Sequence, residues 1–407
     1  MEKRQSNWIL YISYFLSQFC VFFVNPYLSL ESLKTTSPRL GLFIVILIWI
    51  APFFAQATTM YLFSWIAEKK RKIKFLITLG YSVNFVQFCA LYFVKTTHKF
   101  ANNALLVLLV TGVCNLFIVA YIPAIKTYLS SYNIERRNKG KSLSGINMME
   151  SFSWALGILA GSILYDLVPL FTMIIVAICF SASSIVLIPF LPSMSTTQII
   201  QTETNSETNL TEISSPNQSV LSFKEALIYQ FLLLLMASSF FGLLSAYLQF
   251  LNMPTWFYGI ANAIPGILAI FMFYLFGRIL DRFGPNALYH FGWISYLLVY
   301  IGLLSNNVIV IFGVWIWPAY TFRLVTEYLA SHQKDKSQAI RNMALAGFVN
   351  IGGIVAGNFF GGILTLFSTQ LNIQFRIVLL VSLVGIFIVG FWLFLLHVTR
   401  KRKSLVF

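Results

Sequence analysis

Charged residues are scarce in this chain. Only 10% of its 407 residues are Asp, Glu, Lys or Arg, whereas a soluble domain carries about 25%. Hydrophobic residues make up 58% of the chain, and phenylalanine alone occurs 40 times. So few charges could not cover that much apolar surface in water. The composition therefore excludes an ordinary cytosolic enzyme, a secreted domain and a disordered chain, and it indicates an integral membrane protein.

Cysteine and histidine are also rare, with four of each. Every cysteine lies inside an apolar run, none belongs to a CxxC pair, and the histidines are scattered. These positions predict no disulfide, no metal site and no cofactor. The chain also lacks GxxxxGK[ST], HExxH, DxxD and GxSxG. Their absence excludes ATP hydrolysis by this chain and argues against the alternative of a polytopic membrane enzyme.

Long apolar runs are the dominant positive feature. A membrane-spanning helix needs about 20 predominantly apolar residues, and the chain has twelve such runs. Because the runs are continuously apolar rather than alternating, they indicate helices and not a barrel. We therefore predict an all-α membrane protein whose helices span residues 8–28, 41–66, 75–94, 104–127, 142–164, 168–190, 227–250, 256–279, 287–304, 308–328, 339–366 and 373–397.

The basic residues are distributed unevenly around these runs. Lys and Arg total 28 against 13 acids, giving a net charge of +15. With the N-terminus inside, 21 of the 28 fall in gaps on the inner side and 4 on the outer side. Cytoplasmic loops carry this excess in membrane proteins. We expect a multi-pass protein of the cell membrane with both termini cytoplasmic, and the charge then needs no nucleic-acid partner.

The gap between the sixth and seventh apolar runs divides the chain into two similar parts. It is rich in Ser, Thr, Asn and Gln, a composition typical of a flexible linker. The sequence thus predicts an N-terminal six-helix bundle over residues 1–191, a cytoplasmic linker over 192–224 and a C-terminal six-helix bundle over 225–407. Short motifs recur at equivalent places in the two parts, as in Gly157-Ile-Leu-Ala-Gly161 and Gly353-Ile-Val-Ala-Gly357. Such duplication is typical of secondary transporters.

The loop after the eighth run carries the motif Gly277-Arg-Ile-Leu-Asp281-Arg282-Phe-Gly284, and a degenerate copy with Glu68 and Lys69 follows the second run. With the twelve runs and the linker, this motif resembles the loop signature of major facilitator superfamily permeases. The resemblance covers nearly the whole chain. It implies twelve helices in two pseudo-symmetric bundles and transport of a small solute by alternating access. The chain departs from the drug/proton antiporter pattern, because Ser162 and Asn358 stand where that pattern has proline.

The resemblance also suggests how the two parts move. Gly277 lets a neighbouring helix approach, while Asp281 can accept hydrogen bonds from a helix N-terminus. We interpret six residues as a conformational latch, although the same charges would also hold the loops in the cytoplasm: Gly277, Asp281, Arg282, Gly284, Glu68 and Lys69. Glycines at intervals of four favour close helix packing, and we assign that role to Gly157, Gly161, Gly353, Gly357 and Gly361.

Charges within the apolar runs are the candidate functional residues, because each costs about 2.5–3.5 kcal/mol to insert. Glu150 lies deepest, about 12 Å from the inner end of its run. We interpret it as a proton or cation site, the alternatives being a structural pair with Lys126 or a neutral carboxyl bonded to Asn147. Arg323 and Glu327 can pair on one helix face, or Arg323 can contact an anionic substrate.

Other polar and aromatic residues could line a central cavity, although helix contacts explain each of them equally well. The ones we select are Gln18, Asn25, Trp317 and Tyr320. The predicted partners are a small-molecule substrate, protons and the lipid bilayer, with no nucleic acid, and the expected state is a monomer. A transporter-like sensor or scaffold that moves no solute is the alternative function.

Overall fold

A computed structural model describes residues 2–35, 38–69, 72–97, 104–122, 124–125, 139–191, 221–283, 285–315, 317, 319–331 and 336–404. This part of the chain is helical throughout and contains no strand. The N-terminal helices are α1 (Glu2–Thr35), α2 (Pro38–Lys69), α3 (Ile73–Thr96), α4 (Ala104–Ile118), α6 (Lys139–Leu167), α7 (Leu170–Val186) and the 3-10 turn η2 (Ile188–Phe190). The C-terminal helices are α9 (Phe223–Ala237), η3 (Phe241–Leu243), α10 (Leu244–Phe250), α11 (Thr255–Phe283), α12 (Asn286–Leu304), α13 (Val308–Trp315), η4 (Ala319–Arg323), α14 (Leu324–Ser331), α15 (Lys336–Thr365) and α16 (Leu371–Ser404).

Each of the twelve predicted runs coincides with one or more of these helices, so the predicted fold class is confirmed. Among the described residues, eight helical segments are long and apolar enough to cross a membrane, and three shorter apolar helices accompany them. Several predicted runs are broken. The sixth is divided into α7 and η2, the seventh into α9, η3 and α10, and the tenth into α13, η4 and α14, while α4 ends at Ile118 within the fourth run.

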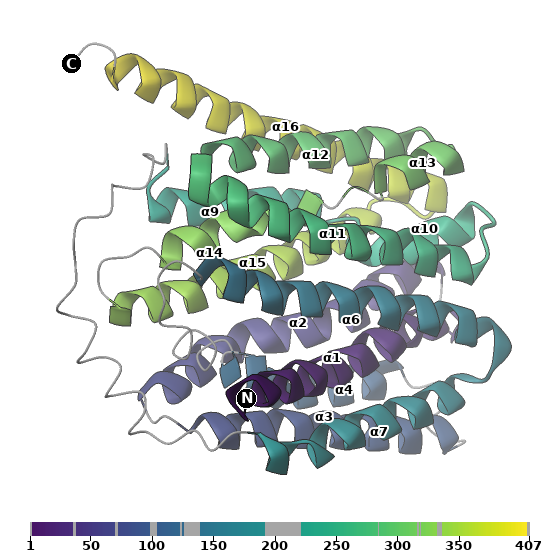
Figure 1. Ribbon diagram of the computed structural model, residues 1–407. Helices are drawn as coiled ribbons and strands as arrows, with labels where there is room; N and C mark the ends of the chain where they lie inside the picture. Colours follow the sequence, from purple (N-terminus) through teal and green to yellow (C-terminus); the bar gives the residue numbers. More distant parts are fainter. Residues whose placement is uncertain are drawn as a thin grey trace.

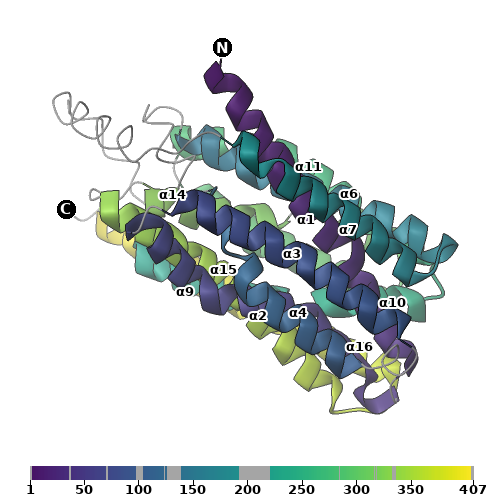
Figure 2. The same ribbon diagram turned by 90° about the horizontal axis from the view of Figure 1, so that it is seen from below.

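The helices form two groups. In Figure 1, the purple to teal helices α1 to α7 lie together in the lower part of the molecule, and the green to yellow helices α9 to α16 lie above them. We refer to these groups as the N-terminal half and the C-terminal half. Helix α1 begins and helix α16 ends at the same end of the bundle (Figures 1 and 2). The two halves meet mainly where α6 packs on α11 and α2 packs on α15.

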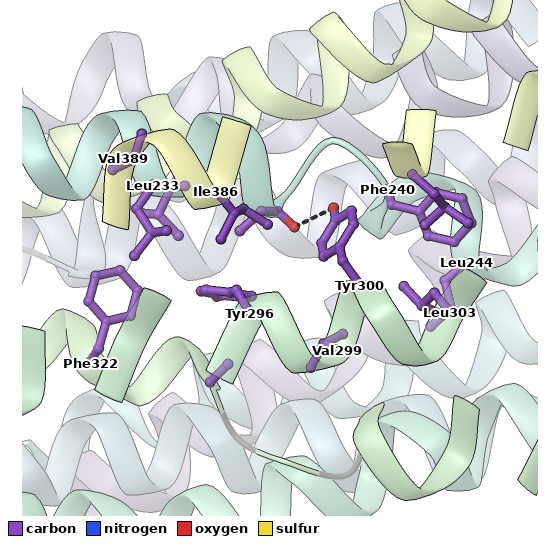
Figure 3. Packing of buried hydrophobic residues seen from close by; sticks show 14 of the residues in the cluster. Leu233, Phe240, Leu244, Tyr296, Val299, Tyr300, Leu303, Phe322, Ile386 and Val389 are labelled. Carbon is purple, nitrogen blue, oxygen red and sulfur yellow. Dashed lines mark hydrogen bonds between the residues drawn. The ribbon is translucent and has the colours of Figure 1, made fainter. Parts of the chain in front are cut away.

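Most buried side chains pack within one half, although the largest cluster also includes Leu42, Ile46 and Ile50 of α2 and Ile158 of α6. In the C-terminal half, Tyr296 and Tyr300 of α12 pack with Leu233 of α9 and Phe240, which follows it (Figure 3). The Tyr300 hydroxyl donates a hydrogen bond of 2.8 Å to the carbonyl of Ala237. This bond satisfies a polar group that would otherwise be buried without a partner. Each half is therefore a packed body, and the contact between the two bodies can be considered by itself.

Candidate functional site

An ion pair joins the two halves. Glu150 lies on α6, about 16 Å from the start of a helix that is about 43 Å long. Arg323 ends η4, and its Nη2 lies 3.4 Å from Oε2 of Glu150. The side chain of Arg323 is 13% exposed, and that of Glu150 is 32% exposed. The pair thus brings a carboxylate from the N-terminal half against a guanidinium from the C-terminal half, inside the bundle.

A hydrogen bond joins the halves beside this pair. Asn147 Nδ2 donates to Glu327 Oε2 over 2.9 Å, and both side chains are buried. Asn147 precedes Glu150 by three residues, and Glu327 follows Arg323 by four. Residues at these spacings share one helix face. One face of α6 therefore contacts one face of the α14 region through two neighbouring polar contacts. We call Glu150, Arg323, Asn147 and Glu327 the inter-half cluster.

Aromatic side chains surround the cluster. The guanidinium of Arg323 lies 5.5 Å from the ring centroid of Phe273 on α11, within the range of a cation–π contact. Tyr14 of α1 is 2% exposed and lies close enough to interact electrostatically with Glu150 and Arg323. The Arg323 side chain is only 13% exposed, so its charge interacts there more strongly than it would at a surface.

The site retains hydrogen-bonding capacity. Among the described residues, Asn147 Oδ1 and the Tyr14 hydroxyl are buried and have no hydrogen-bond partner. Buried polar groups in native structures are nearly always satisfied, so such exceptions mark positions with a function or a bound group. Both atoms belong to residues at the inter-half cluster. An amide oxygen and a phenol together can accept and donate hydrogen bonds to a polar solute.

A second network holds Arg323 and Glu327 in place. Thr326 lies between these two residues in the sequence. Its hydroxyl donates to the Arg323 carbonyl over 2.9 Å and also contacts Gln230 Oε1 of α9. Gln230 Nε2 in turn donates to Asn350 Oδ1 of α15 over 3.3 Å. This network ties α14 to α9 and α15 within the C-terminal half. Arg323 and Glu327 are consequently carried by one rigid group of helices.

Glycines bring α6 and α11 into close contact. A Cβ atom at Gly266 would lie 2.7 Å from that of Ala155, and one at Gly259 would overlap the side chain of Ser162. Real Cβ atoms do not approach other atoms so closely, and only glycine lets the two helix backbones lie this near each other. On the opposite side of the interface, Gly347 of α15 meets the Met60 side chain of α2 in the same way.

Two of the remaining sequence candidates donate hydrogen bonds to residues outside the inter-half cluster. Gln18 is buried in the N-terminal half, where its amide donates to the Tyr121 hydroxyl over 2.8 Å. Asn25 lies further along α1, and its Oδ1 is buried without a partner among the described atoms. Trp317 lies against α12 and donates to Ser295 Oγ over 2.9 Å. Lys126 lies outside the described residues, as does the side chain of Tyr320.

The predicted glycine ladders pack within the halves. Gly157 and Gly161 lie against α1, where added Cβ atoms would meet the carbonyl oxygens of Phe19 and Phe23 at 2.9 and 2.5 Å. The second ladder consists of Gly353, Gly357 and Gly361 on α15. It packs against α9 and the residues that follow α9. These contacts join helices of the same half. Of the latch residues, Gly277 is half-buried on α11, Gly284 lies outside the described residues, and the side chains of Glu68, Lys69, Asp281 and Arg282 do too.

Sequence reasoning missed several residues of this site. Tyr14 is one tyrosine among 19 and stands in an apolar run without a distinguishing neighbour. Gly259 and Gly266 are seven residues apart, so they do not match the interval of four that we searched. Seven residues are nevertheless close to two helical turns and return to the same face. That longer interval was the available signal for the contact between α6 and α11.

The fold and the site define a class of protein. Two helical halves that cross a membrane and meet at a buried charged cluster are the architecture of a secondary transporter. The chain belongs to the Major Facilitator Superfamily, whose family model matches residues 8–331. This membership confirms the family suggested by the loop signature and establishes a multi-pass secondary membrane transporter.

Solved structures share this fold. A crystal structure of a mutant form of the nucleoside transporter NupG has a TM-score of 0.69 and 12% identity, covering 95% of this chain and 98% of that one. Another NupG crystal structure has a TM-score of 0.65 and 14% identity, with 96% and 98% coverage. A bacterial homologue of the iron transporter ferroportin, in an outward-facing state, has a TM-score of 0.60, 14% identity and the same coverage. A comparison with curated proteins finds no match.

Proposed function

We propose that this protein moves a small polar solute by alternating access, with a proton bound at Glu150 as the coupling ion. The observation that carries the proposal is the ion pair between Glu150 of one half and Arg323 of the other. If the halves rock against each other, a contact between them is made in one conformation and broken in another. A titratable group in such a contact links its protonation to the movement.

The energies of the pair support this role. At an effective dielectric constant near 20, charges 3.4 Å apart attract by about 5 kcal/mol. Removing ions from water costs several kcal/mol each. In the intact pair, the attraction between the charges roughly offsets the cost of removing them from water. When the pair separates, that attraction is lost, so each charge must be neutralised or find another partner.

Protonation and solute binding supply that compensation. A proton on Glu150 neutralises the carboxylate, so its attraction to the guanidinium is lost. Arg323 is then left with its charge beside Phe273, where an acceptor-rich or anionic group of the solute can take the place of Glu150. Asn147 Oδ1 and the Tyr14 hydroxyl offer further hydrogen bonds at the same place. Under this scheme proton and solute favour each other's binding, which is the thermodynamic basis of coupling.

The rest of the proposal follows from the sequence. We assign residues 1–191 and 225–407 to the two moving units and residues 192–224 to the linker between them. Asp281 and Arg282, with Gly277, act as the latch after α11, and Glu68 and Lys69 act as its weaker counterpart. The protein works as a monomer in the cell membrane with both termini in the cytoplasm. It moves solutes without catalysing a reaction.

The first experiment identifies the solute. Purified protein is screened by thermal shift against sugars, organic anions, amino acids, nucleosides and hydrophobic drugs, and each hit is tested for flux in proteoliposomes with and without a proton gradient. We expect an organic anion or another acceptor-rich solute to raise the Tm and to accumulate when the gradient is imposed. Specific binding without any flux would instead support the sensor function. Flux that ignores the gradient would contradict proton coupling.

A further inference from the structure

A groove runs along the outer surface of the C-terminal half, between α12 and α16. These helices lie side by side in Figure 1. The groove has a volume of about 480 Å³, and its lining consists of His290, Trp293, Ile294, Phe387, Phe391 and Phe394. The three phenylalanines are 54%, 49% and 49% exposed in chain order. The walls of the groove are almost wholly apolar, whereas the inter-half cluster is polar and charged.

The groove is shaped by a glycine. A Cβ atom at Gly390 of α16 would lie 2.4 Å from the indole ring of Trp293. The absence of a side chain at Gly390 lets the indole lie directly on α16. The Trp293 ring thereby forms the base between the two helices, while Phe387 and Phe391, stacked at an interplanar angle of 8°, form one wall. An aromatic slot of this kind accommodates a hydrocarbon chain.

One end of the groove is polar. The Trp293 Nε1–H donates to His290 Nδ1 over 3.2 Å, and this bond assigns the remaining imidazole proton to Nε2. The ring of His397 lies 5.3 Å from that of His290. His290 is near the start of α12, and His397 is near the end of α16. Both imidazoles therefore lie towards the end of the bundle where the chain terminates.

Positive charge follows directly beyond this end. Helix α16 has 34 residues and continues through Arg400-Lys-Arg-Lys, so it is about 51 Å long against a hydrocarbon core of about 30 Å. Its last turns extend past the neighbouring helices in Figure 1. Arg400 Nη2 bonds to Glu225 Oε1 over 2.6 Å, which fixes this end of α16 to the start of α9. Four consecutive basic residues at the end of a membrane helix attract anionic lipid headgroups.

We propose that the groove binds an anionic glycerophospholipid from the leaflet at the C-terminal end of α16. One acyl chain lies along Phe387, Phe391 and Trp293. The phosphate is placed beside the imidazoles of His290 and His397, within the positive field of the basic run. The apolar slot provides affinity for the chain, and the charge at its end provides preference for an acidic headgroup. This site is separate from the transport cycle proposed above.

The test measures lipid binding to the purified, delipidated full-length protein. Native mass spectrometry counts bound dioleoyl phosphatidylglycerol and dioleoyl phosphatidylcholine, which have the same chains and different headgroups. Since the two lipids differ only in headgroup charge, we expect phosphatidylglycerol to bind about tenfold more tightly than phosphatidylcholine. Ile294→Trp fills the groove and should abolish the binding of phosphatidylglycerol at this site. Its control is Ile267→Trp on α11, a position of similar exposure at 40% against 43%.

A second measurement keeps the test decisive if Ile294→Trp fails to fold. Phosphatidylglycerol with a photoreactive acyl chain is crosslinked to the wild-type protein, and the labelled peptides are identified. We expect labels on residues 287–298 and 387–397. Equal binding of the two lipids, unchanged binding of phosphatidylglycerol by Ile294→Trp, or labels confined to other helices would each overturn the proposal.

Discussion

The guanidinium of Arg323 lies 3.4 Å from the carboxylate of Glu150, although the two residues are 173 positions apart and belong to different halves of the molecule. Each is carried by a helix that is firmly packed within its own half. Neither residue can leave the other without a movement of the halves or of its side chain. Their contact therefore connects the electrostatics of the site with the arrangement of the two halves.

Arg323→Gln should destabilise the protein more than the simultaneous change of both partners. Removing the guanidinium leaves the Glu150 carboxylate without its partner, at a cost below the roughly 3–5 kcal/mol of a fully buried pair because 32% of the Glu150 side chain is exposed. In Glu150→Gln/Arg323→Gln no such charge remains, so we expect much of the lost Tm to be recovered. Thermal unfolding of the single and double variants in one detergent checks this. If the double variant loses the sum of the two single losses, the residues are not energetically coupled.

Substitutions of Gly259 and Gly266 should separate α6 from α11. In Gly266→Leu the new side chain meets Ala155, and in Gly259→Ala the new methyl group meets Ser162. Overpacking of this kind costs about 1–3 kcal/mol. We expect solute flux to fall by tenfold or more, on the order of that energy, while each half remains folded.

Gly352→Ala provides the matched control for these glycine variants. This glycine also lies within a long helix, but an added Cβ atom there has no neighbour within 4 Å. Alanine should be neutral or slightly stabilising at that position, because it has the higher helix propensity. Flux in Gly352→Ala should equal that of the wild type. Wild-type flux in Gly266→Leu as well would show that the contact between α6 and α11 does not limit transport.

Asp281→Asn should slow the exchange between conformations. The substitution removes the negative charge that we assign to the latch after α11 but preserves the size of the side chain. We expect turnover to fall several-fold with little change in solute affinity, since the latch is remote from the inter-half cluster. Flux measured over a range of solute concentrations separates these two effects. Turnover equal to that of the wild type would leave Asp281 with only a topological role.

Much of the fold followed from local properties of the sequence. The lengths of the apolar runs predicted the helices correctly, because each span must satisfy its own backbone hydrogen bonds within the lipid. The broken seventh and tenth runs were not predicted. Overall hydropathy does not mark such breaks, because each run remains predominantly apolar from end to end. The loop signature and the two similar halves were sufficient to indicate the family.

The site was only partly predictable. Burial cost singled out Glu150 and Arg323, since any charge in an apolar run requires compensation. Their pairing could not be inferred, because it depends on which helices of the two halves face each other. From the sequence we considered Lys126 and Asn147 as partners of Glu150, and Glu327 as the partner of Arg323. In the described part of the chain the structure joins Glu150 to Arg323 and Asn147 to Glu327, and Lys126 lies outside that part.

The most direct test of this account is gradient-driven uptake by Glu150→Gln in proteoliposomes, using the solute identified by the thermal-shift screen. We predict that the wild type accumulates the solute when a proton gradient is imposed, whereas Glu150→Gln binds it and exchanges it downhill without accumulation. Glu225→Gln, which removes a carboxylate paired with Arg400 outside the interface, should accumulate as the wild type does. Accumulation by Glu150→Gln at the wild-type rate and with the wild-type pH dependence would contradict the account.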